Sequence, residues 1–154
     1  MIIILEGPDG SGKSTLAEQL HRQTGYQLLH RTQPKNEEDK KRMMDEYIQV
    51  MKAGKNVIMD RAWYSEMVYG PVMRDTSVIT FPQMYELERL AAKNGAIVIY
   101  CTAPEATLWK RCMRRGEDYI TNRDTFHAIC TGFRELMNGV PHMIPVVTYE
   151  YEDM

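Results

Sequence analysis

Residues 7–14 of this 154-residue chain read GPDGSGKS, a set of glycines followed by a lysine and a serine. The pattern G-x-x-x-x-G-K-S follows an apolar run, residues 1–5, and precedes an amphipathic segment, residues 14–24. A strand, a glycine-rich turn and a helix in this order aim backbone N–H groups at a polyphosphate. Lys13, exposed in the loop, is expected to reach the β- and γ-phosphates, and the Ser14 hydroxyl to ligate Mg²⁺. The predicted nucleotide-binding residues are Gly7, Gly10, Ser11, Gly12, Lys13, Ser14 and Thr15.

A second group of reactive residues follows another apolar run, at residues 56–60. Asp60 ends this run and is expected to hold Mg²⁺ through water, as an aspartate beside a phosphate-binding loop commonly does. Arg61 stands where an ATPase usually has a second carboxylate, so it suits the binding of an anionic acceptor rather than hydrolysis. Ser65 and Tyr69 follow on the same segment. The alternative interpretation of Asp60 and Arg61 is a surface ion pair at a strand end.

A run of cations ends at Gly116, and its members are Lys110, Arg111, Arg114 and Arg115. Phosphoryl transfer spreads negative charge over the equatorial oxygens of the transferred group, and a mobile arginine lid can neutralise it. The sequence therefore predicts a lid segment at about residues 111–121 that also excludes water. The alternative is a cationic last helical turn that only complements the helix dipole.

Asp9 lies inside the glycine-rich loop. A carboxylate beside a polyphosphate is electrostatically unfavourable, because like charges repel. Its presence suggests that it faces a neutral donor on a second substrate. A sugar hydroxyl is the obvious candidate for that donor.

Strand-like and helix-like segments alternate along the chain, which is typical of a parallel sheet with helices on both faces. The predicted strands are residues 1–5, 27–31, 56–60, 96–101 and 144–149. Helices are predicted at residues 14–24, between the polar stretch 32–39 and Gly54, and at residues 82–94, 104–115 and 122–138. Pro145 cannot donate to a β-ladder, so the last strand is expected at an edge. The fold class is therefore α/β, and we expect one domain over residues 1–154.

The composition limits the partners and the cellular compartment that we expect for this domain. The net charge of −2 gives no reason to expect a nucleic-acid or membrane partner. No apolar run approaches the length of a membrane span, and residues 1–5 read as a strand rather than a signal sequence. The three cysteines and four histidines show no metal-ligand spacing. We expect buried, reduced thiols and a cytoplasmic protein.

Residues 6–15, the segment from Asp60 to Tyr69 and the arginine-rich residues 111–115 together resemble thymidylate kinase. The resemblance runs along the whole chain in order. It implies a three-layer αβα fold of the P-loop NTPase type, with a five-stranded parallel sheet of order 2-3-1-4-5. The implied reaction transfers a phosphoryl group from ATP to dTMP with Mg²⁺ and gives dTDP. The family usually dimerises, so the resemblance leaves a homodimer open.

The resemblance also implies roles for single residues. Asp9 would bond the 3′-hydroxyl of the deoxyribose, and Tyr69 would crowd the 2′ position and so favour deoxynucleotides. One branch of the family has a catalytic arginine directly after the loop aspartate, where this chain has Gly10. The catalytic arginine would then come from the lid. The implied catalytic residues are Lys13, Arg61, Arg111, Arg114 and Arg115, and the implied substrate-binding residues are Asp9, Arg61, Ser65 and Tyr69.

The chain departs from this family between the second and third predicted strands, where it is clearly shorter than most members. That region usually supplies an aromatic residue that stacks on thymine and an arginine that reads the base. The family's Arg-Glu-Pro-Gly is replaced here by residues 31–34, RTQP. Arg42 and Tyr47 could substitute, but their spacing equally suits an ordinary helix, which we favour. The preferred base therefore stays open, and the compact chain resembles phage-encoded versions that would work in a host cytoplasm.

Two other functions are compatible with the phosphate-binding pattern. A deoxynucleoside kinase must deprotonate a 5′-hydroxyl, so it needs a general base, typically a carboxylate after the second strand. Gln33 stands there, which favours a monophosphate acceptor. A non-catalytic nucleotide-binding module would not require Lys13, Ser14, Asp60 and several lid arginines together.

Overall fold

The computed structural model describes residues 1–115 and 122–150. These residues contain a five-stranded parallel sheet of order β2-β3-β1-β4-β5, which confirms the predicted fold class and strand order. The strands are β1 (Ile2–Glu6), β2 (Gln27–His30), β3 (Val57–Asp60), β4 (Ile97–Thr102) and β5 (Val146–Glu150).

The strand β1 is central, and all five of its residues are buried. A near-continuous run of branched apolar residues is what a parallel strand covered on both faces requires. In its register with β3, Leu5 lies opposite Asp60, and in the register of β2 with β3, His30 lies opposite Asp60. The polar residues at the carboxyl ends of three strands therefore meet at one edge of the sheet, where open α/β sheets bind ligands.

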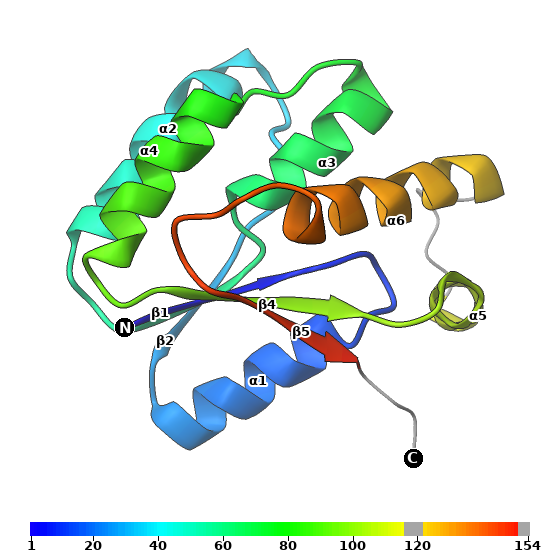
Figure 1. The fold of residues 1–154 in the computed structure, drawn as a ribbon, viewed down its shortest axis with the longest axis horizontal. Coiled ribbons are helices and arrows are strands. Elements are labelled where there is room, and N and C mark those ends of the chain that lie inside the picture. The colour runs from blue at the N-terminus through cyan, green and yellow to red at the C-terminus, as the bar shows by residue number, and fades with distance from the viewer. Residues whose placement is uncertain (116–121, 151–154) are drawn as a thin grey trace.

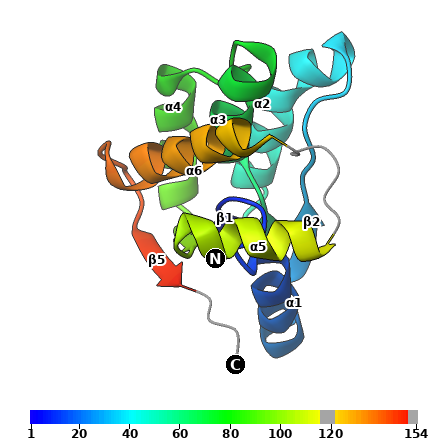
Figure 2. The ribbon, with the colours of Figure 1, turned by 90° about the vertical axis from the view of Figure 1, so that its right-hand side faces the viewer.

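Helices cover both faces of the sheet, as predicted (Figure 1). One face is covered by α1, while α2, α3, α4 and α6 lie over the other face, and α5 lies across the carboxyl ends of the strands (Figures 1 and 2). The helices are α1 (Lys13–Thr24), α2 (Glu37–Lys52), α3 (Trp63–Arg74), α4 (Phe81–Ala92), α5 (Glu105–Arg115) and α6 (Arg123–Asn138).

The two faces of the sheet have separate apolar clusters. On one face, Ala17 of α1 packs with Ile3, Leu5 and Ile58. On the other face, the larger cluster includes Trp63 and Phe133, which are fully buried. Burying a large apolar side chain contributes about 1.5–3 kcal/mol, so these clusters hold the strand ends in place.

The structure contains one helix that was not predicted and corrects one local prediction. The segment from Trp63 to Arg74 forms the helix α3, which the sequence pattern did not indicate because it is apolar on several sides and contains Pro71. Pro145 lies just before β5 rather than inside it, and its carbonyl oxygen accepts a hydrogen bond from the amide of Val98 (2.9 Å). The edge position of β5 is nevertheless confirmed.

Cys101, Cys112 and Cys130 are buried, as expected. Among the described residues, the helices are too short or too polar to cross a membrane.

Candidate active site

The loop between β1 and α1 is shaped by glycines in conformations that other residues rarely adopt. Gly7 has φ 151°, and a Cβ there would lie 2.1 Å from the carbonyl oxygen of Cys101 in β4. Gly10 has φ 82°, and a Cβ there would lie 2.8 Å from the carbonyl oxygen of Leu108 in α5. The first turn of α1 has no side-chain cap. Its amides are therefore available to a phosphate, in the arrangement that the GPDGSGKS pattern predicts.

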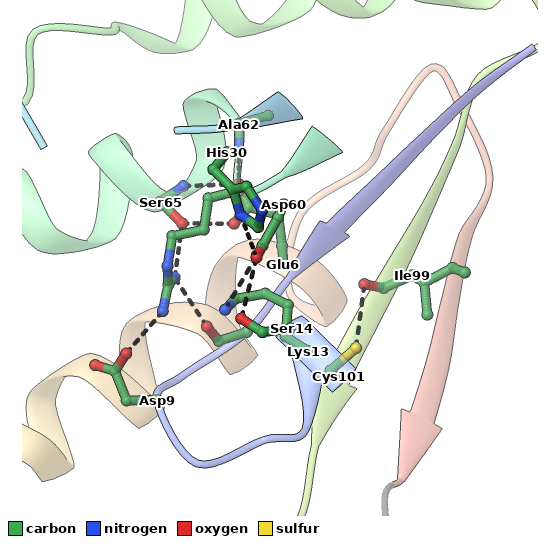
Figure 3. Close-up of polar contacts among 12 residues, drawn as sticks. Glu6, Asp9, Lys13, Ser14, His30, Asp60, Ala62, Ser65, Ile99 and Cys101 are labelled. Carbon is green, nitrogen blue, oxygen red and sulfur yellow. Dashed lines mark hydrogen bonds and ion pairs between the residues drawn. The ribbon is translucent and has the colours of Figure 1, made fainter. Parts of the chain in front are cut away.

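Lys13, Ser14 and Asp60 meet beside this loop (Figure 3). The Ser14 hydroxyl donates to Asp60 Oδ2 (3.0 Å), and Lys13 Nζ lies 3.3 Å from Asp60 Oδ1. Lys13 is only 8% exposed, so the expectation of an exposed loop lysine was wrong. Burial and the Arg61 charge lower the pKa of Lys13, and the Asp60 carboxylate opposes this shift. Burial alone would raise the pKa of Asp60, but the Lys13 charge and hydrogen bonds from Ser14 and Lys13 outweigh it and lower that pKa.

The oxygen atoms of Ser14 and Asp60 fit a magnesium ion. Mg²⁺ prefers hard oxygen ligands and is usually held by one or two side chains together with water and substrate phosphates. Asp60 Oδ1 is buried beside the Lys13 ammonium, and a carboxylate oxygen with two lone pairs keeps capacity for a further partner. Within the described residues there is no larger group of His, Cys, Asp and Glu that could hold a metal ion.

His30 also contacts Asp60, with Nδ1 3.0 Å from Oδ2 (Figure 3). No role for His30 was expected from the sequence. The sequence signal for this contact was the alignment of two strands. His30 ends β2 as Asp60 ends β3, so the two residues lie opposite each other when the strands pair in parallel.

The other predicted substrate-binding residues lie around the guanidinium of Arg61. Its Nη1 donates to the Gly7 carbonyl (3.0 Å) and to Ser65 Oγ (2.9 Å), and its Nη2 donates to Asp9 Oδ1 (3.0 Å) and Tyr69 Oη (3.2 Å). The Tyr69 hydroxyl donates to Asp9 Oδ2 (2.9 Å). Asp9 thus contacts a cation as well as a neutral donor, which the sequence did not suggest.

These contacts bear on the alternative interpretation of Asp60 and Arg61, a surface ion pair at a strand end. Asp60 pairs with Lys13, and Arg61 pairs with Asp9. The two neighbours therefore have separate partners and do not form a simple surface pair with each other. Arg61 has φ 74°, a left-handed conformation that is uncommon for a residue with a Cβ and that recurs at functional sites.

Glu6 holds the backbone that follows Arg61, a role that was not expected from the sequence. This fully buried carboxylate accepts hydrogen bonds from the amides of Ala62 (3.0 Å) and Ser65 (2.9 Å) and from Ser65 Oγ (2.5 Å) (Figure 3). Burial raises the pKa of Glu6, while the Arg61 charge and these hydrogen bonds lower it in part. The sequence signal for this role was a glutamate at the end of an apolar strand.

A cavity of about 480 Å³ opens beside Arg61. Its walls come from the segment after β2 and from α2 and α3. Its lining includes Arg31, Met43, Tyr47, Arg61, Tyr69 and Met73. Tyr47 is buried in the core, as an ordinary helix residue would be, but it also lines this cavity. Arg42 instead is exposed on α2 and pairs with Asp39.

The predicted lid arginines divide into two groups on α5. Arg111 is buried and donates to the Gly10 carbonyl (3.2 Å), so it braces the phosphate-binding loop. Arg114 and Arg115 are exposed in the last turn. Residues 116–121 of the predicted lid lie outside the described residues. The close approach of α5 also explains Gly10, since no side chain fits between the loop and this helix.

A family model described as an AAA domain, AAA_33, matches residues 2–135. The chain belongs to this family. It is also 33% identical over 139 residues to the SPbeta prophage-derived uncharacterized protein YorR of Bacillus subtilis (strain 168). That match covers 90% of this AAA-domain chain and 82% of YorR.

Solved structures agree with this assignment. The crystal structure of Bacillus subtilis YorR in complex with phosphorylated GDP matches with a TM-score of 0.82 and 28% identity, over 97% of this chain and 85% of that chain. Deoxyadenosine kinase from M. mycoides with dCMP and dCDP bound matches with a TM-score of 0.67 and 18% identity, over 97% and 90% of the two chains. The latter likeness concerns the fold alone. The AAA domain therefore has a P-loop kinase-like nucleotide-binding fold.

Proposed function

We propose that this protein is a nucleoside monophosphate kinase of the thymidylate kinase type, which transfers the γ-phosphoryl group of ATP to a deoxynucleoside monophosphate. The single observation that carries the proposal is Arg61. Its guanidinium contacts Gly7 and Asp9 of the phosphate-binding loop on one side. On the other side it lines the cavity of about 480 Å³. A fixed cation in this place suits an acceptor that already carries a phosphate.

On the donor side, the amides of the loop and Lys13 bind the ATP phosphates, and Ser14 and Asp60 would hold Mg²⁺. Bound Mg²⁺ would neutralise charge on the β- and γ-phosphate oxygens. The pairing of Lys13 with Asp60 keeps the ammonium directed at the loop in a largely buried place. Low exposure strengthens the interaction of this charge with phosphate, because less water screens it.

On the acceptor side, Arg61 and Ser65 bind the monophosphate and direct one of its oxygens at the γ-phosphorus of ATP. The new phosphorus–oxygen bond forms as the bond to the bridging oxygen breaks and ADP leaves. Asp9 and Tyr69 face the sugar, where Asp9 accepts from the 3′-hydroxyl and Tyr69 crowds the 2′ position. Arg111, Arg114 and Arg115 supply further positive charge from α5 and the lid segment.

The proposal names the acceptor as a deoxynucleoside monophosphate and leaves its nucleobase to be identified by experiment. Thymine is the first candidate from the resemblance, but YorR was crystallised in complex with phosphorylated GDP, so guanine nucleotides belong among the acceptors to test. The prophage origin in the name of YorR supports a phage-type protein that works in a host cytoplasm. The proposal also takes residues 1–154 as one kinase domain and leaves a homodimer open.

A deoxynucleoside kinase is the second candidate, because one carboxylate, Glu66, does line the cavity. A general base needs an oxygen within reach of the 5′-hydroxyl proton. Both oxygens of Glu66 are occupied, one by Arg74 and the other by the amide of Val78 (2.8 Å). This supports the monophosphate over the nucleoside.

The test is ATP turnover with dTMP, dGMP, dCMP, dAMP and GMP beside the five parent nucleosides. We expect at least one monophosphate to give the diphosphate and ADP, and no nucleoside to react. Turnover of nucleosides alone would instead assign a nucleoside kinase. ATP binding without turnover of any acceptor would assign a non-catalytic nucleotide-binding module.

A further inference from the structure

Glu6 connects the phosphate-binding loop to the acceptor arginine through a short chain of contacts. The carboxylate ends β1, directly before Gly7, and is fully buried. Its oxygens accept from the amides of Ala62 and Ser65 and from Ser65 Oγ, and Ser65 Oγ in turn accepts from Arg61 Nη1. The chain is continuous, since each link is at most 3.0 Å long.

The second observation is the backbone of Arg61. This residue has φ 74° and its amide donates to the carbonyl of Leu5 (3.0 Å). A left-handed residue with a Cβ persists only where its surroundings fix it on both sides. Leu5 holds the amide of Arg61, and Glu6 holds the next peptide through the amide of Ala62. Two successive residues of β1 therefore clamp Arg61.

The carboxylate also caps α3. Ala62 is the N-cap of this helix and has no side-chain oxygen of its own, so the orphan amides of the first turn need another acceptor. Glu6 supplies it from a different element of the fold. A negative charge at a helix N-terminus is further favoured by the helix dipole.

From these contacts we propose that Glu6 is a positioning residue, which fixes Arg61 and the first turn of α3 relative to the phosphate-binding loop and so sets the alignment of the acceptor. The inference rests on the proposed function, because it assigns Arg61 to the acceptor phosphate. Glu6 touches neither substrate. Its effect passes through Ser65 and the peptide after Arg61, and it leaves the contacts of Lys13 and Ser14 with ATP intact.

Glu6→Gln is the sharpest test, since glutamine has the same shape. Its amide keeps one acceptor oxygen for the amides of Ala62 and Ser65 and places an NH₂ group at the Oε1 position, so the hydrogen bond that Ser65 Oγ donates there is lost. We expect kcat/KM for the best monophosphate to fall about 100-fold, because misplacing a reacting group by about 1 Å has such an effect. The Kd of ADP should change less than about threefold, because the ADP contacts are unchanged.

Glu88→Gln is the matched control. Glu88 is also fully buried, and it accepts from the Tyr64 hydroxyl (2.5 Å) and the Met143 amide (2.8 Å), with His142 Nδ1 at 2.6 Å. It therefore also holds α3, through Tyr64, but none of these three contacts involves Arg61 or Ser65. We expect Glu88→Gln to lower the melting temperature and to leave the KM of the acceptor near the wild-type value.

The outcomes separate this inference from the proposed function. A wild-type protein that turns over no monophosphate overturns the proposed function. The positioning role of Glu6 is then tested by calorimetry, in which Glu6→Gln must raise the Kd of dTMP or dGMP and Glu88→Gln must not. Equal losses of ADP and acceptor binding in Glu6→Gln would overturn the positioning role, as would wild-type kinetics in the folded variant. If Glu6→Gln does not fold, Glu6→Asp keeps the charge but shortens the side chain by one methylene, and it must raise the acceptor KM without changing the Kd of ADP.

Discussion

Arg61 stands at the junction of the phosphate-binding loop and the cavity, and its charge is oriented before any substrate arrives. Its guanidinium contacts the Gly7 carbonyl and Ser65, and it stacks over the ring of Tyr69 at 5.0 Å from the centroid. Preorganised charge stabilises a transition state without reorganisation at the moment of reaction. A strained backbone of the Arg61 type costs about 1–3 kcal/mol, which the surrounding contacts must offset.

The first residue-scale prediction concerns Lys13. Lys13→Met should abolish phosphoryl transfer, because the ATP phosphates lose their cation. The burial of Lys13 changes the expectation for stability, since the variant leaves the Asp60 carboxylate without its ion-pair partner. Removing one partner of a buried pair costs up to about 3–5 kcal/mol, so the variant should melt at a lower temperature and still be folded at 25 °C.

ATP turnover together with circular dichroism measures both effects of Lys13→Met. Lys110→Met, which removes an exposed lysine of α5, is the control and should leave stability near that of the wild type. A folded Lys13→Met variant with wild-type turnover would contradict the role of Lys13.

The second residue-scale prediction concerns the sugar. Tyr69→Ala should raise the ratio of kcat/KM for ribonucleotides to that for deoxyribonucleotides, because the ring no longer fills the space at the 2′ position. Tyr69 is 2% exposed and its ring packs on Phe133 with centroids 5.8 Å apart, so the variant should also lose stability. Tyr69→Phe keeps the ring and should keep the ratio. An unchanged ratio in Tyr69→Ala would mean that Tyr69 does not face the 2′ position.

At the scale of elements, α5 acts as a support for the phosphate-binding loop. Its residues Leu108, Arg111 and Cys112 lie against Gly10, and Arg111 holds the Gly10 carbonyl. The helix therefore holds the loop in place from the side of the strand ends. Because α5 approaches Gly10 closely, position 10 has no room for an arginine side chain, which supports the proposal that a catalytic arginine comes from elsewhere in the chain.

The connection between α6 and β5 is held by a buried histidine, which predicts a pH-dependent stability. His142 is 5% exposed by its side chain, with Nδ1 2.6 Å from Glu88 Oε2 and Nε2 2.7 Å from the carbonyl oxygen of Leu136. Both partners are acceptors, so the folded protein favours the doubly protonated ring. Burial alone would lower the pKa of His142, but the hydrogen bonds to Glu88 and Leu136 outweigh it and raise that pKa.

The sign of the pH dependence follows from the raised pKa. Because the folded state binds the proton more tightly, the contribution of His142 is fully present below the ordinary histidine pKa of about 6.5 and is lost as the pH rises through the raised value. We expect the difference in unfolding free energy between the wild type and His142→Gln to shrink between pH 6 and pH 9, measured by urea denaturation. A difference that grows with pH would contradict this protonation state.

At the scale of the whole molecule, the alternation of strand and helix patterns predicted the α/β fold class, and the resemblance to thymidylate kinase implied the order of the strands. The edge position of β5 followed from Pro145, although Pro145 itself lies outside the strand. The helix α3 could not be predicted, since a helix buried on most sides has no polar face to reveal its period.

The residues of the candidate site also divide into those that the sequence indicated and those that it did not. The structure brings Lys13, Ser14 and Asp60 together, and it brings Asp9, Ser65 and Tyr69 around Arg61. Motif patterns and the resemblance found these residues because they lie in two short segments of recognisable residue types, residues 7–15 and 60–69. Glu6 and His30 act through partners at least 30 residues away, and such contacts exist only after the sheet has formed.

The most direct measurement of the central claim is steady-state ATP turnover by the wild type and by Arg61→Met, with the best monophosphate of the panel and its parent nucleoside side by side. We expect the wild type to convert the monophosphate to the diphosphate and to leave the nucleoside unchanged. We also expect Arg61→Met to lower kcat/KM for the monophosphate by at least about 100-fold with little change in the Kd of ADP. Phosphorylation of the nucleoside alone, or full monophosphate turnover by Arg61→Met, would contradict the claim.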